Sequence, residues 1–276
     1  SIEFDNGVTK TIAIAAKEQT VFTISSLFDG VAQPDIRSGV IKKGSGIIGL
    51  ELFGSSPSSG NSCLSGVLLK DDTVTEIYYP HVVSSDIWWT GVVAYNPSGV
   101  SADITVTPFK SDGTALSPQT ITLARKEKFV GTTAQLNFPE GTAWFRIDAI
   151  SPLAGFELFG TNNGKQLGGY TGVDISGNDG VFAKIEKDGW TGISFVNTED
   201  SPATVSIIAY NDDGDSIAAE ILNLGAYEKV TGVAQDLFAQ SIDGATYIKY
   251  SSSRKIVGFQ LNGSSDNMML DGLPGM

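Results

Sequence analysis

An internal repeat constrains this chain more than any other feature of its sequence. The tripeptide Trp-Thr-Gly at residues 89–91 recurs 101 residues later at 190–192. The hexapeptide Gly-Phe-Glu-Leu-Phe-Gly at 155–160 recurs 103 residues later, at 258–263, as Gly-Phe-Gln-Leu-Asn-Gly, and an earlier copy, Gly-Leu-Glu-Leu-Phe-Gly, occupies 49–54. Because the spacing is nearly constant, we infer that one structural unit of about 100 residues is repeated along the chain.

The repeat predicts three β-sandwich modules in the 276 residues. Module 1, residues 1–75, is incomplete, whereas module 2, residues 76–176, and module 3, residues 177–276, are long enough for each to bury its own core. Module 1 begins about two strands late and the chain opens at Ser1 without a leader, so we expect a trimmed fragment. Upstream residues, another chain or module 2 are expected to complete module 1. The junctions, 71–76 and 174–179, are short and polar, which predicts limited movement between modules.

The pattern of short apolar stretches predicts an all-β fold. Module 2 has seven stretches rich in Val, Ile, Thr and aromatic residues, separated by turn residues, at 77–83, 87–95, 102–110, 119–123, 142–150, 154–161 and 167–172. Module 3 repeats the pattern at 192–196, 203–210, 217–222, 246–251 and 256–261. Seven short strands in this length predict an immunoglobulin-like sandwich, with a jelly roll or a small barrel as alternatives. One or two helical turns are expected at 231–238, with counterparts at 133–136 and 24–28.

Composition restricts the classes of function. The formal charge of −13, from 18 basic and 31 acidic residues, disfavours nucleic acids and anionic membranes as partners. No apolar run approaches the roughly 20 residues of a membrane-spanning helix, so we expect no membrane insertion. Cys63 is the only cysteine and His81 the only histidine. No disulfide can form within the chain, no cofactor is expected, and most catalytic and metal-binding motifs are ruled out.

Alignment of the repeats sorts residues by the side of the strand they occupy. Trp89 and Trp190 match, which predicts core tryptophans, and the aligned pairs Phe145 with Ile248 and Ile147 with Tyr250 predict the inward face of one strand. The outward face of that strand then carries Trp144 and Arg146 in module 2, and Tyr247 and Lys249 in module 3. Trp88 is expected to point away from Trp89, toward solvent or a neighbouring module.

Outward aromatic residues beside cations favour sugar stacking or protein docking. The candidate ligand-binding residues are therefore Trp88, Trp144, Arg146, Tyr247 and Lys249. Packing between adjacent modules is the alternative explanation.

Three further positions predict how modules stack. Phe53 and Phe159 occupy an outward register in modules 1 and 2, and Asn262 stands there in module 3. This change from apolar to polar predicts that the following module covers this face, with module 3 as a cap.

Single polar residues give weaker hypotheses. The Asn-Asp-Asp-Gly-Asp stretch offers Asp212, Asp213 and Asp215 as candidate calcium ligands, although it lacks the distal Glu of an EF-hand and also fits a solvated hairpin turn. His81 has no second histidine with which to share a metal and is expected to be an inert strand-end residue. Cys63, beside the Ser-Gly-Asn-Ser loop at 59–62, has no nearby residue in sequence that lowers its pKa.

The ordered motifs of module 2 resemble a tandem module of bacterial secreted and cell-surface proteins. These motifs are Trp-Thr-Gly at 89–91, Asn-Pro at 96–97, Asp-Gly at 112–113 and Gly-Phe-Glu-Leu-Phe-Gly at 155–160. Module 3 departs from the pattern at Thr198, where the proline is absent, and at Asn262. The resemblance implies β-sandwich architecture and export, and it implies no particular substrate.

Together these observations predict a non-enzymatic, secreted or cell-surface bacterial protein, with the periplasm as a further location. Scarcity of cysteine fits the cytosol equally well. The expected role is a spacer, adhesin-like or protein-interaction module, with a protein or a glycan at the cell surface as partner. The first alternative is a carbohydrate-binding module that uses Trp88, Trp144 and Tyr247. The second is a glycan-active enzyme, which requires Glu157 and another acid facing one groove.

Overall fold

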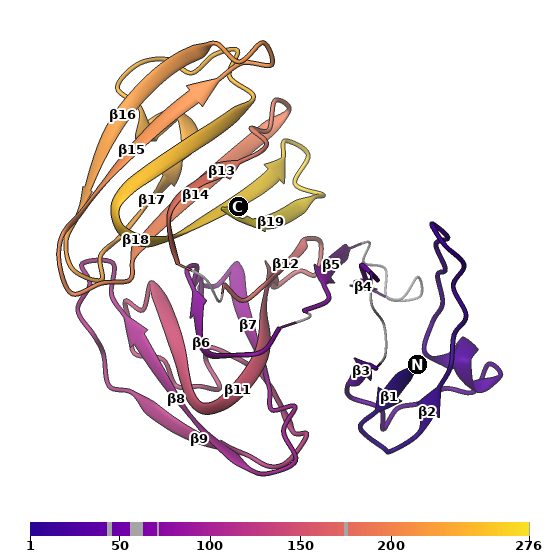
Figure 1. Cartoon of the computed structure of the whole chain (residues 1–276). Helices are drawn as coiled ribbons and strands as arrows, with labels where there is room; N and C mark the ends of the chain where they lie inside the picture. The colour runs from indigo at the N-terminus through magenta and orange to yellow at the C-terminus, as the bar shows by residue number, and fades with distance from the viewer. Residues whose placement is uncertain (43–45, 56–62, 71, 174–175, 276) are drawn as a thin grey trace. The chain divides into compact units, whose positions relative to one another are not determined.

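The computed structural model describes residues 1–42, 46–55, 63–70, 72–173 and 176–275. The described residues contain strands, turns and short 3-10 helices but no α-helix, which confirms the predicted all-β class (Figure 1). The chain forms two compact units, Ser1–Gly49 and Leu50–Met276. The module boundaries at 75/76 and 176/177 stay a prediction. Residues 59–62 of the loop beside Cys63, and residues 71 and 174–175 of the two junctions, lie outside the described residues.

The unit Ser1–Gly49 is built on a small antiparallel sheet in the order β2-β1-β3, with β1 at Ile2–Phe4, β2 at Thr9–Lys10 and β3 at Gly39–Ile41. A 3-10 helix, η1, spans Ser25–Phe28, in agreement with the helical turn predicted for 24–28. Phe4 is buried, and its ring centroid lies 5.6 Å from that of Phe28. Lys10 places its ammonium 4.5 Å from the centre of the Phe28 ring.

The unit Leu50–Met276 begins with the hairpin β4 (Leu50–Gly54) and β5 (Leu64–Leu68) and continues as two copies of one sandwich. The strands of module 2 are β6 (Val74–Tyr79), which begins two residues before the predicted boundary, β7 (Trp88–Tyr95), β8 (Ala102–Phe109), β9 (Gln119–Leu123), β10 (Lys128–Thr132), β11 (Trp144–Thr161) and β12 (Leu167–Thr171). Those of module 3 are β13 (Gly177–Phe182), β14 (Gly189–Asn197), β15 (Ala203–Tyr210), β16 (Ser216–Leu224), β17 (Lys229–Val233), β18 (Tyr247–Ser264) and β19 (Leu270–Pro274). The 3-10 helix η3 at Ala234–Leu237 fits the helical turn predicted for 231–238.

One long strand belongs to both layers of each sandwich. The first half of β11 pairs with β6 and β8, and its second half pairs with β7 and β12. The register with β6 shifts between Asp148 and Leu153, where Pro152 has no N–H to donate. The layers are therefore β9-β8-β11-β6 and β10-β7-β11-β12. In module 3, β18 has the same role, with β15 and β13 on its first half and β14 and β19 on its second.

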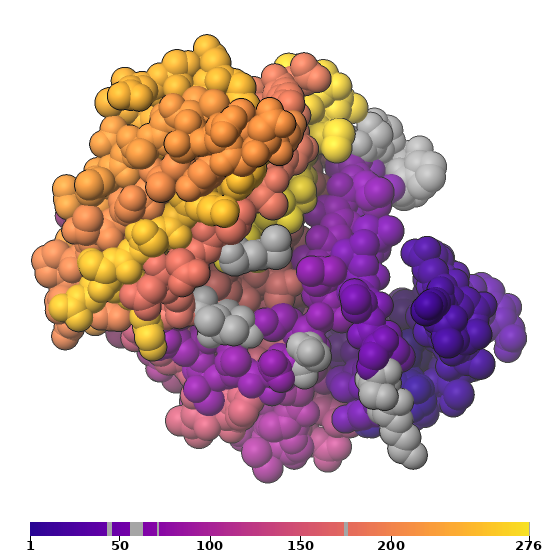
Figure 2. Space-filling view, turned by 45° about the horizontal axis from the view of Figure 1, so that its top comes forward, coloured from indigo at the N-terminus to yellow at the C-terminus, as the bar shows by residue number. Residues whose placement is uncertain are grey.

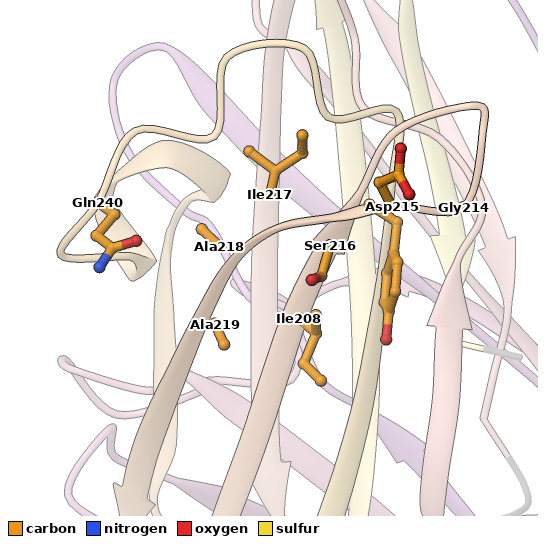
Figure 3. Close-up of a pocket in the computed structure, with 9 residues that line it drawn as sticks. Ile208, Gly214, Asp215, Ser216, Ile217, Ala218, Ala219 and Gln240 are labelled. Atoms are coloured by element: carbon orange, nitrogen blue, oxygen red, sulfur yellow. The ribbon is translucent and has the colours of Figure 1, made fainter.

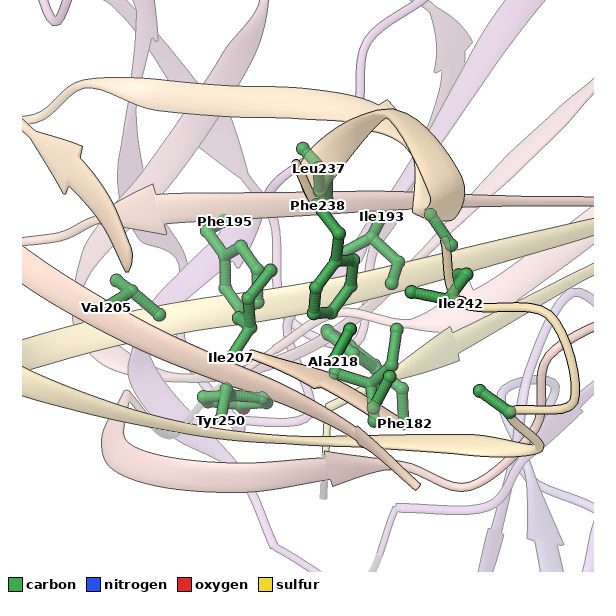
Figure 4. Close-up of a cluster of buried hydrophobic side chains, with 14 of the residues drawn as sticks. Phe182, Ile193, Phe195, Val205, Ile207, Ala218, Leu237, Phe238, Ile242 and Tyr250 are labelled. Atoms are coloured by element: carbon green, nitrogen blue, oxygen red, sulfur yellow. The ribbon is translucent and has the colours of Figure 1, made fainter. Parts of the chain in front are cut away.

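Each sandwich encloses its own hydrophobic core, as the alternation of apolar residues predicts. The core of module 2 contains Ile77, Tyr79, Val92, Ala94, Ile104, Val106, Leu123, Leu136, Phe145, Ile147 and Leu153. In module 3, side chains from the two layers and from η3 converge in the same way (Figure 4). The predicted inward pairs, Phe145 with Ile248 and Ile147 with Tyr250, all lie in these cores.

The prediction that Trp89 and Trp190 are core residues is wrong, because both are only partly buried and lie outside the module cores. Val92 and Ala94 of β7 face the core, so Trp89 lies on the opposite face of the strand. Its ring lies so close to Gly91 and Gly160 that a Cβ on either glycine would come within 2.9 Å of a ring atom. The Trp89 ring therefore lies across Gly91 of its own strand, β7, and Gly160 of the adjacent strand, β11.

Candidate functional site

Module 2 and module 3 meet in an aromatic cluster centred on Trp144. The Trp144 side chain is 0% exposed, and its ring stacks on Phe109 with centroids 4.0 Å apart. Its Nε1–H donates to the carbonyl oxygen of Tyr227 at 3.1 Å. Val196 and Val257 of module 3 complete the cluster. Trp144 is therefore inaccessible to a ligand, and packing between modules accounts for it.

A tight turn of module 3 fits onto a hairpin turn of module 2. Tyr227 has a left-handed conformation, with φ of 56°, and its ring centroid lies 5.6 Å from that of Phe109. The backbone N–H of Lys229 donates to the carbonyl of Ser111 at 2.8 Å. A Cβ added to Gly113 would lie 2.1 Å from the carbonyl oxygen of Ala226. Glycine at this position lets the two turns touch through their backbones.

The contact also encloses polar groups that the sequence pattern did not reveal. Glu157 is fully buried and accepts a hydrogen bond from the Tyr170 hydroxyl at 2.7 Å. Lys229 extends from module 3 and donates through Nζ to the carbonyl of Ala143 at 2.9 Å. In the space-filling view, orange and yellow atoms of module 3 lie against purple and magenta atoms of module 2 (Figure 2).

Burial controls the electrostatics of this cluster. It raises the pKa of the Glu157 carboxyl well above its usual value, and the Tyr170 hydrogen bond and the Lys229 charge only partly oppose the shift. Burial likewise lowers the pKa of Lys229 to about 8 and that of His81 to about 3. The His81 ring lies 6.0 Å from Phe159 and 5.6 Å from Phe259, so it is part of the apolar contact between modules.

Phe159 has the role that the repeat predicts, whereas Asn262 does not. Phe159 is fully buried and packs against Phe259 of module 3, with centroids 6.1 Å apart. Phe53 stacks on Phe156 at 6.3 Å. Asn262, predicted to lie on a polar cap, is 3% exposed and accepts a hydrogen bond from the Thr191 hydroxyl at 2.7 Å. The apolar-to-polar change therefore places an internal hydrogen bond in module 3.

Arg146 is held by carboxylates of its own module. Its Nε donates to Asp148 at 2.9 Å, and its guanidinium lies 3.7 Å from Glu76. The guanidinium of Arg146, which the sequence predicts to bind a ligand, is therefore already paired with two carboxylates of module 2.

Tyr247 is partly exposed and Lys249 is exposed, and both adjoin a third residue, Tyr210. The Tyr247 ring stacks on Tyr210, with centroids 5.2 Å apart and planes 9° from parallel. The Lys249 ammonium lies 5.3 Å from the centre of the Tyr210 ring. Beside this pair is a hollow of about 550 Å³ lined by Tyr210, Asp215 and Gln240, among others (Figure 3). Sequence analysis missed Tyr210, although it is the repeat counterpart of Phe109.

Trp88 is partly buried against the apolar contact between modules 2 and 3, which agrees with its expected direction toward a neighbour. It borders a second hollow, of about 400 Å³, that Lys165, Asp266 and Met268 also line. Trp88 borders this second hollow, whereas Tyr247 stacks on Tyr210 at the first one, so the five predicted ligand-binding residues do not form one site.

The acidic stretch of module 3 is a hairpin turn organised by Asn211. The Asn211 side-chain oxygen accepts hydrogen bonds from the N–H groups of Asp213 at 3.1 Å and Asp215 at 2.8 Å. The side chains of Asp212, Asp213 and Asp215 are exposed. Within the described part of the chain, no three His, Cys, Asp or Glu side chains are grouped to hold a metal ion. Among the same residues, no helix is long and apolar enough to cross a membrane.

Comparisons with known proteins give distant structural similarities only. No protein-family model and no curated protein sequence matches the chain. A solved structure described as Thermotoga maritima 1070 is 14% identical, with a TM-score of 0.32, over 37% of this chain and 94% of that one. The Anabaena sensory rhodopsin transducer is 22% identical, with a TM-score of 0.26, over 31% of this chain and 96% of that one. A β-glucuronidase from glycoside hydrolase family 2 is 8% identical, with a TM-score of 0.17, over 72% and 23% of the two chains. Similarities of this size assign neither a family nor a function.

Proposed function

We propose that this chain is a non-enzymatic β-sandwich repeat protein, secreted or displayed on a bacterial surface or in the periplasm, that serves as a rigid spacer and protein-interaction module. The observation that supports the proposal best is the contact between modules 2 and 3. It combines a fully buried tryptophan, hydrogen bonds between backbones and an enclosed polar cluster. This construction resembles the interior of one domain rather than a flexible linker.

The energy of the contact supports rigidity. Separating the modules would expose the part of Trp144 that module 3 covers, roughly half of its side-chain surface of about 150–250 Å², because Phe109 of module 2 stacks on the other face. At about 25 cal/mol per Å², this exposure costs about 2–3 kcal/mol. Each 1.4 kcal/mol changes an equilibrium about tenfold, so the exposure of this one residue disfavours the separated state by about 30- to 100-fold.

Distances between spin labels test the rigidity. With Cys63 replaced by Ser, labels at Thr122→Cys and Asn223→Cys lie on exposed strand positions of modules 2 and 3. Double electron–electron resonance should give one narrow distance distribution. The substitution Gly113→Ala should broaden it, because the new Cβ meets the Ala226 carbonyl at 2.1 Å.

Gly214→Ala is the matched control. Gly113 and Gly214 have φ of 84° and 85°, so alanine is similarly strained at both positions, but a Cβ on Gly214 meets nothing within 4 Å. The control should keep the narrow distribution. A broad distribution in the parent chain, or equal broadening by both substitutions, would refute a rigid contact.

Export is tested separately on intact cells of the source organism. A protein at the surface is digested when protease is added outside, and a periplasmic one becomes accessible after the outer membrane is permeabilised. Digestion only after complete lysis would contradict this part of the proposal.

The second candidate function is carbohydrate binding at the surface formed by Tyr210, Tyr247 and Lys249. The observation that favours it is the adjacent hollow, where the carboxylate of Asp215 and the amide of Gln240 are placed to bind sugar hydroxyls beside the Tyr210 ring. A glycan array should then show binding that Tyr210→Ala abolishes and Lys165→Ala, in the other hollow, preserves. Absence of binding, or binding unaffected by Tyr210→Ala, would eliminate this candidate.

A further inference from the structure

A surface of module 3 beside the hollow of about 550 Å³ has the same place in the repeat as the surface of module 2 that receives the Tyr227 turn. We call that surface of module 2 the socket, formed by Phe109, Ser111, Gly113 and Trp144. The repeat spacing places Tyr210, Asp212, Gly214 and Tyr247 at the equivalent positions of module 3.

Backbone geometry confirms the equivalence. The N–H of Ala143 donates to the carbonyl of Phe109 at 2.8 Å, and the N–H of Thr246 donates to that of Tyr210 at 2.7 Å. The two aromatic pairs are close to parallel, with interplanar angles of 5° in module 2 and 9° in module 3. Both modules therefore build the same surface.

The two sockets differ in what covers them. In module 2 the Tyr227 turn touches Gly113, and Trp144 is 0% exposed. In module 3 a Cβ on Gly214 would meet nothing, and Tyr247 is partly exposed. Gly214 and Tyr210 both line the hollow of about 550 Å³. The hollow thus borders the surface that is equivalent to the one covered by the Tyr227 turn in module 2, and shares Tyr210 and Gly214 with it.

We propose that the socket of module 3 binds a further β-sandwich module of the same kind, carried by a partner protein, through a tight turn with an aromatic residue in the left-handed conformation. The inference rests on the proposed interaction role of the chain. Its direct support is the Tyr227 turn, which occupies the equivalent socket of the same molecule with its ring 5.6 Å from Phe109.

The turn itself recurs in the repeat, which makes it a suitable recognition element. Lys17, Lys126 and Tyr227 have φ of 64°, 55° and 56°, and a glutamate follows each of them. Among these three, Tyr227 alone is aromatic, and it packs on an aromatic pair. Because it is already enclosed within its own chain, a second copy of this chain cannot supply it, and the occupant is assigned to a different protein.

Charge further defines the partner. Asp212, which belongs to the socket of module 3, is exposed, and Asp215 lines the adjacent hollow. A lysine two residues after the aromatic residue, as Lys229 follows Tyr227, would be attracted to these carboxylates. The preferred partner turn therefore has an aromatic residue, glutamate and lysine in sequence.

A chain extended by one module tests the proposal at high effective concentration. The sequence Asp-Ile-Ser followed by a copy of residues 177–276 is added after Met276, which repeats the connection between modules 2 and 3. The ends of modules 2 and 3 are equivalent points for attaching a following module. The backbone N–H of Gly172 donates to the carbonyl of Gly155 at 2.9 Å, and that of Gly275 donates to the carbonyl of Gly258 at 2.8 Å. Hydroxyl-radical footprinting should show at least about a fivefold fall in oxidation of Tyr210 and Tyr247, with Tyr95 as reference.

Tyr227→Ala in the added copy should restore the oxidation rate of the parent chain. Unchanged oxidation of Tyr210 and Tyr247 beside a folded added copy would overturn the proposal. If the added copy does not fold, a cyclic Gly-Ala-Tyr-Glu-Lys peptide at millimolar concentration replaces it. That peptide should shift the amide resonance of Gly214 in the parent chain, and neither an Ala-for-Tyr peptide nor the Tyr210→Ala chain should show the shift.

No difference between the two peptides would also overturn the proposal. Glycan binding abolished by Tyr210→Ala, without peptide binding, would overturn it and assign the surface to the second candidate function. The spin-label distances between modules 2 and 3 report on the rigid spacer independently, so failure of the two proposals is distinguishable.

Discussion

Replacing Trp144 by alanine should destabilise the protein far more than the equivalent change at Tyr247. About 200 Å² of side-chain surface at about 25 cal/mol per Å² gives about 5 kcal/mol. Residual compactness of the unfolded chain reduces this figure by roughly 10–40%, to about 3–4.5 kcal/mol. The lost stack on Phe109, 4.0 Å away, adds about 1 kcal/mol. We therefore expect Trp144→Ala to lower the free energy of unfolding by about 4–5.5 kcal/mol, at the upper end of measured large-to-small core substitutions.

Tyr247→Ala is the matched comparison, because it removes an aromatic residue from the same strand position in module 3. Tyr247 is partly exposed and its ring contacts Tyr210 at 5.2 Å, so we expect a loss of about 1 kcal/mol. Trp144→Phe keeps a ring but removes the hydrogen bond to the Tyr227 carbonyl, and it should cost about 1–2 kcal/mol. Urea unfolding followed by far-UV circular dichroism measures all three. Equal losses for Trp144→Ala and Tyr247→Ala would refute the reasoning.

Three further predictions concern charge. Three facts fix the behaviour of His81: burial lowers its folded-state pKa to about 3, its unfolded pKa is about 6.5, and the neutral form is therefore favoured in the folded state. Its contribution to the free energy of unfolding is present above pH 6.5 and is lost on acidification, at up to about 1.4 kcal/mol per pH unit. His81→Phe should remove this loss in urea titrations between pH 6.5 and 4. The folded-state pKa of Glu157 is raised, so its contribution to the free energy of unfolding is present below the unfolded pKa of about 4.5 and is lost as the pH rises through the folded value. Glu157→Gln, which copies Gln260 of module 3, should therefore raise the free energy of unfolding at pH 8. A decrease would contradict an enclosed neutral acid. Millimolar calcium should leave the Tm unchanged by calorimetry, because Asn211 already organises the turn, whereas an upward shift that Asp213→Ala abolishes would revive the calcium hypothesis.

Local sequence patterns predict the strands whose side chains alternate between core and surface. Residues 119–123 form β9 as predicted, and Phe145 and Ile147 face the core. The separate stretches 142–150 and 154–161 are two halves of β11, because the strand bends at Pro152 while its pairing continues. The start of β13, Gly-Asn-Asp-Gly, has the composition of a turn, and pairing with β18 makes it a strand.

The site is less predictable because long-range contacts create it. Glu157 and Lys229 lie on different modules, and no local pattern in the sequence indicates that both charged groups are buried close enough to interact. Trp89 was misassigned because repetition of a tryptophan is also explained by a ring lying across glycines. Tyr210, by contrast, was detectable as the aromatic counterpart of Phe109 in the repeat.

The strand β11 has a consequence for how module 2 comes apart. It contributes to both layers and is hydrogen-bonded to four other strands. Cleavage or local unfolding of β11 would remove a hydrogen-bonded strand from both layers at once. A state with only one layer intact would therefore be unstable. Under tension, such a module would rupture in a single step.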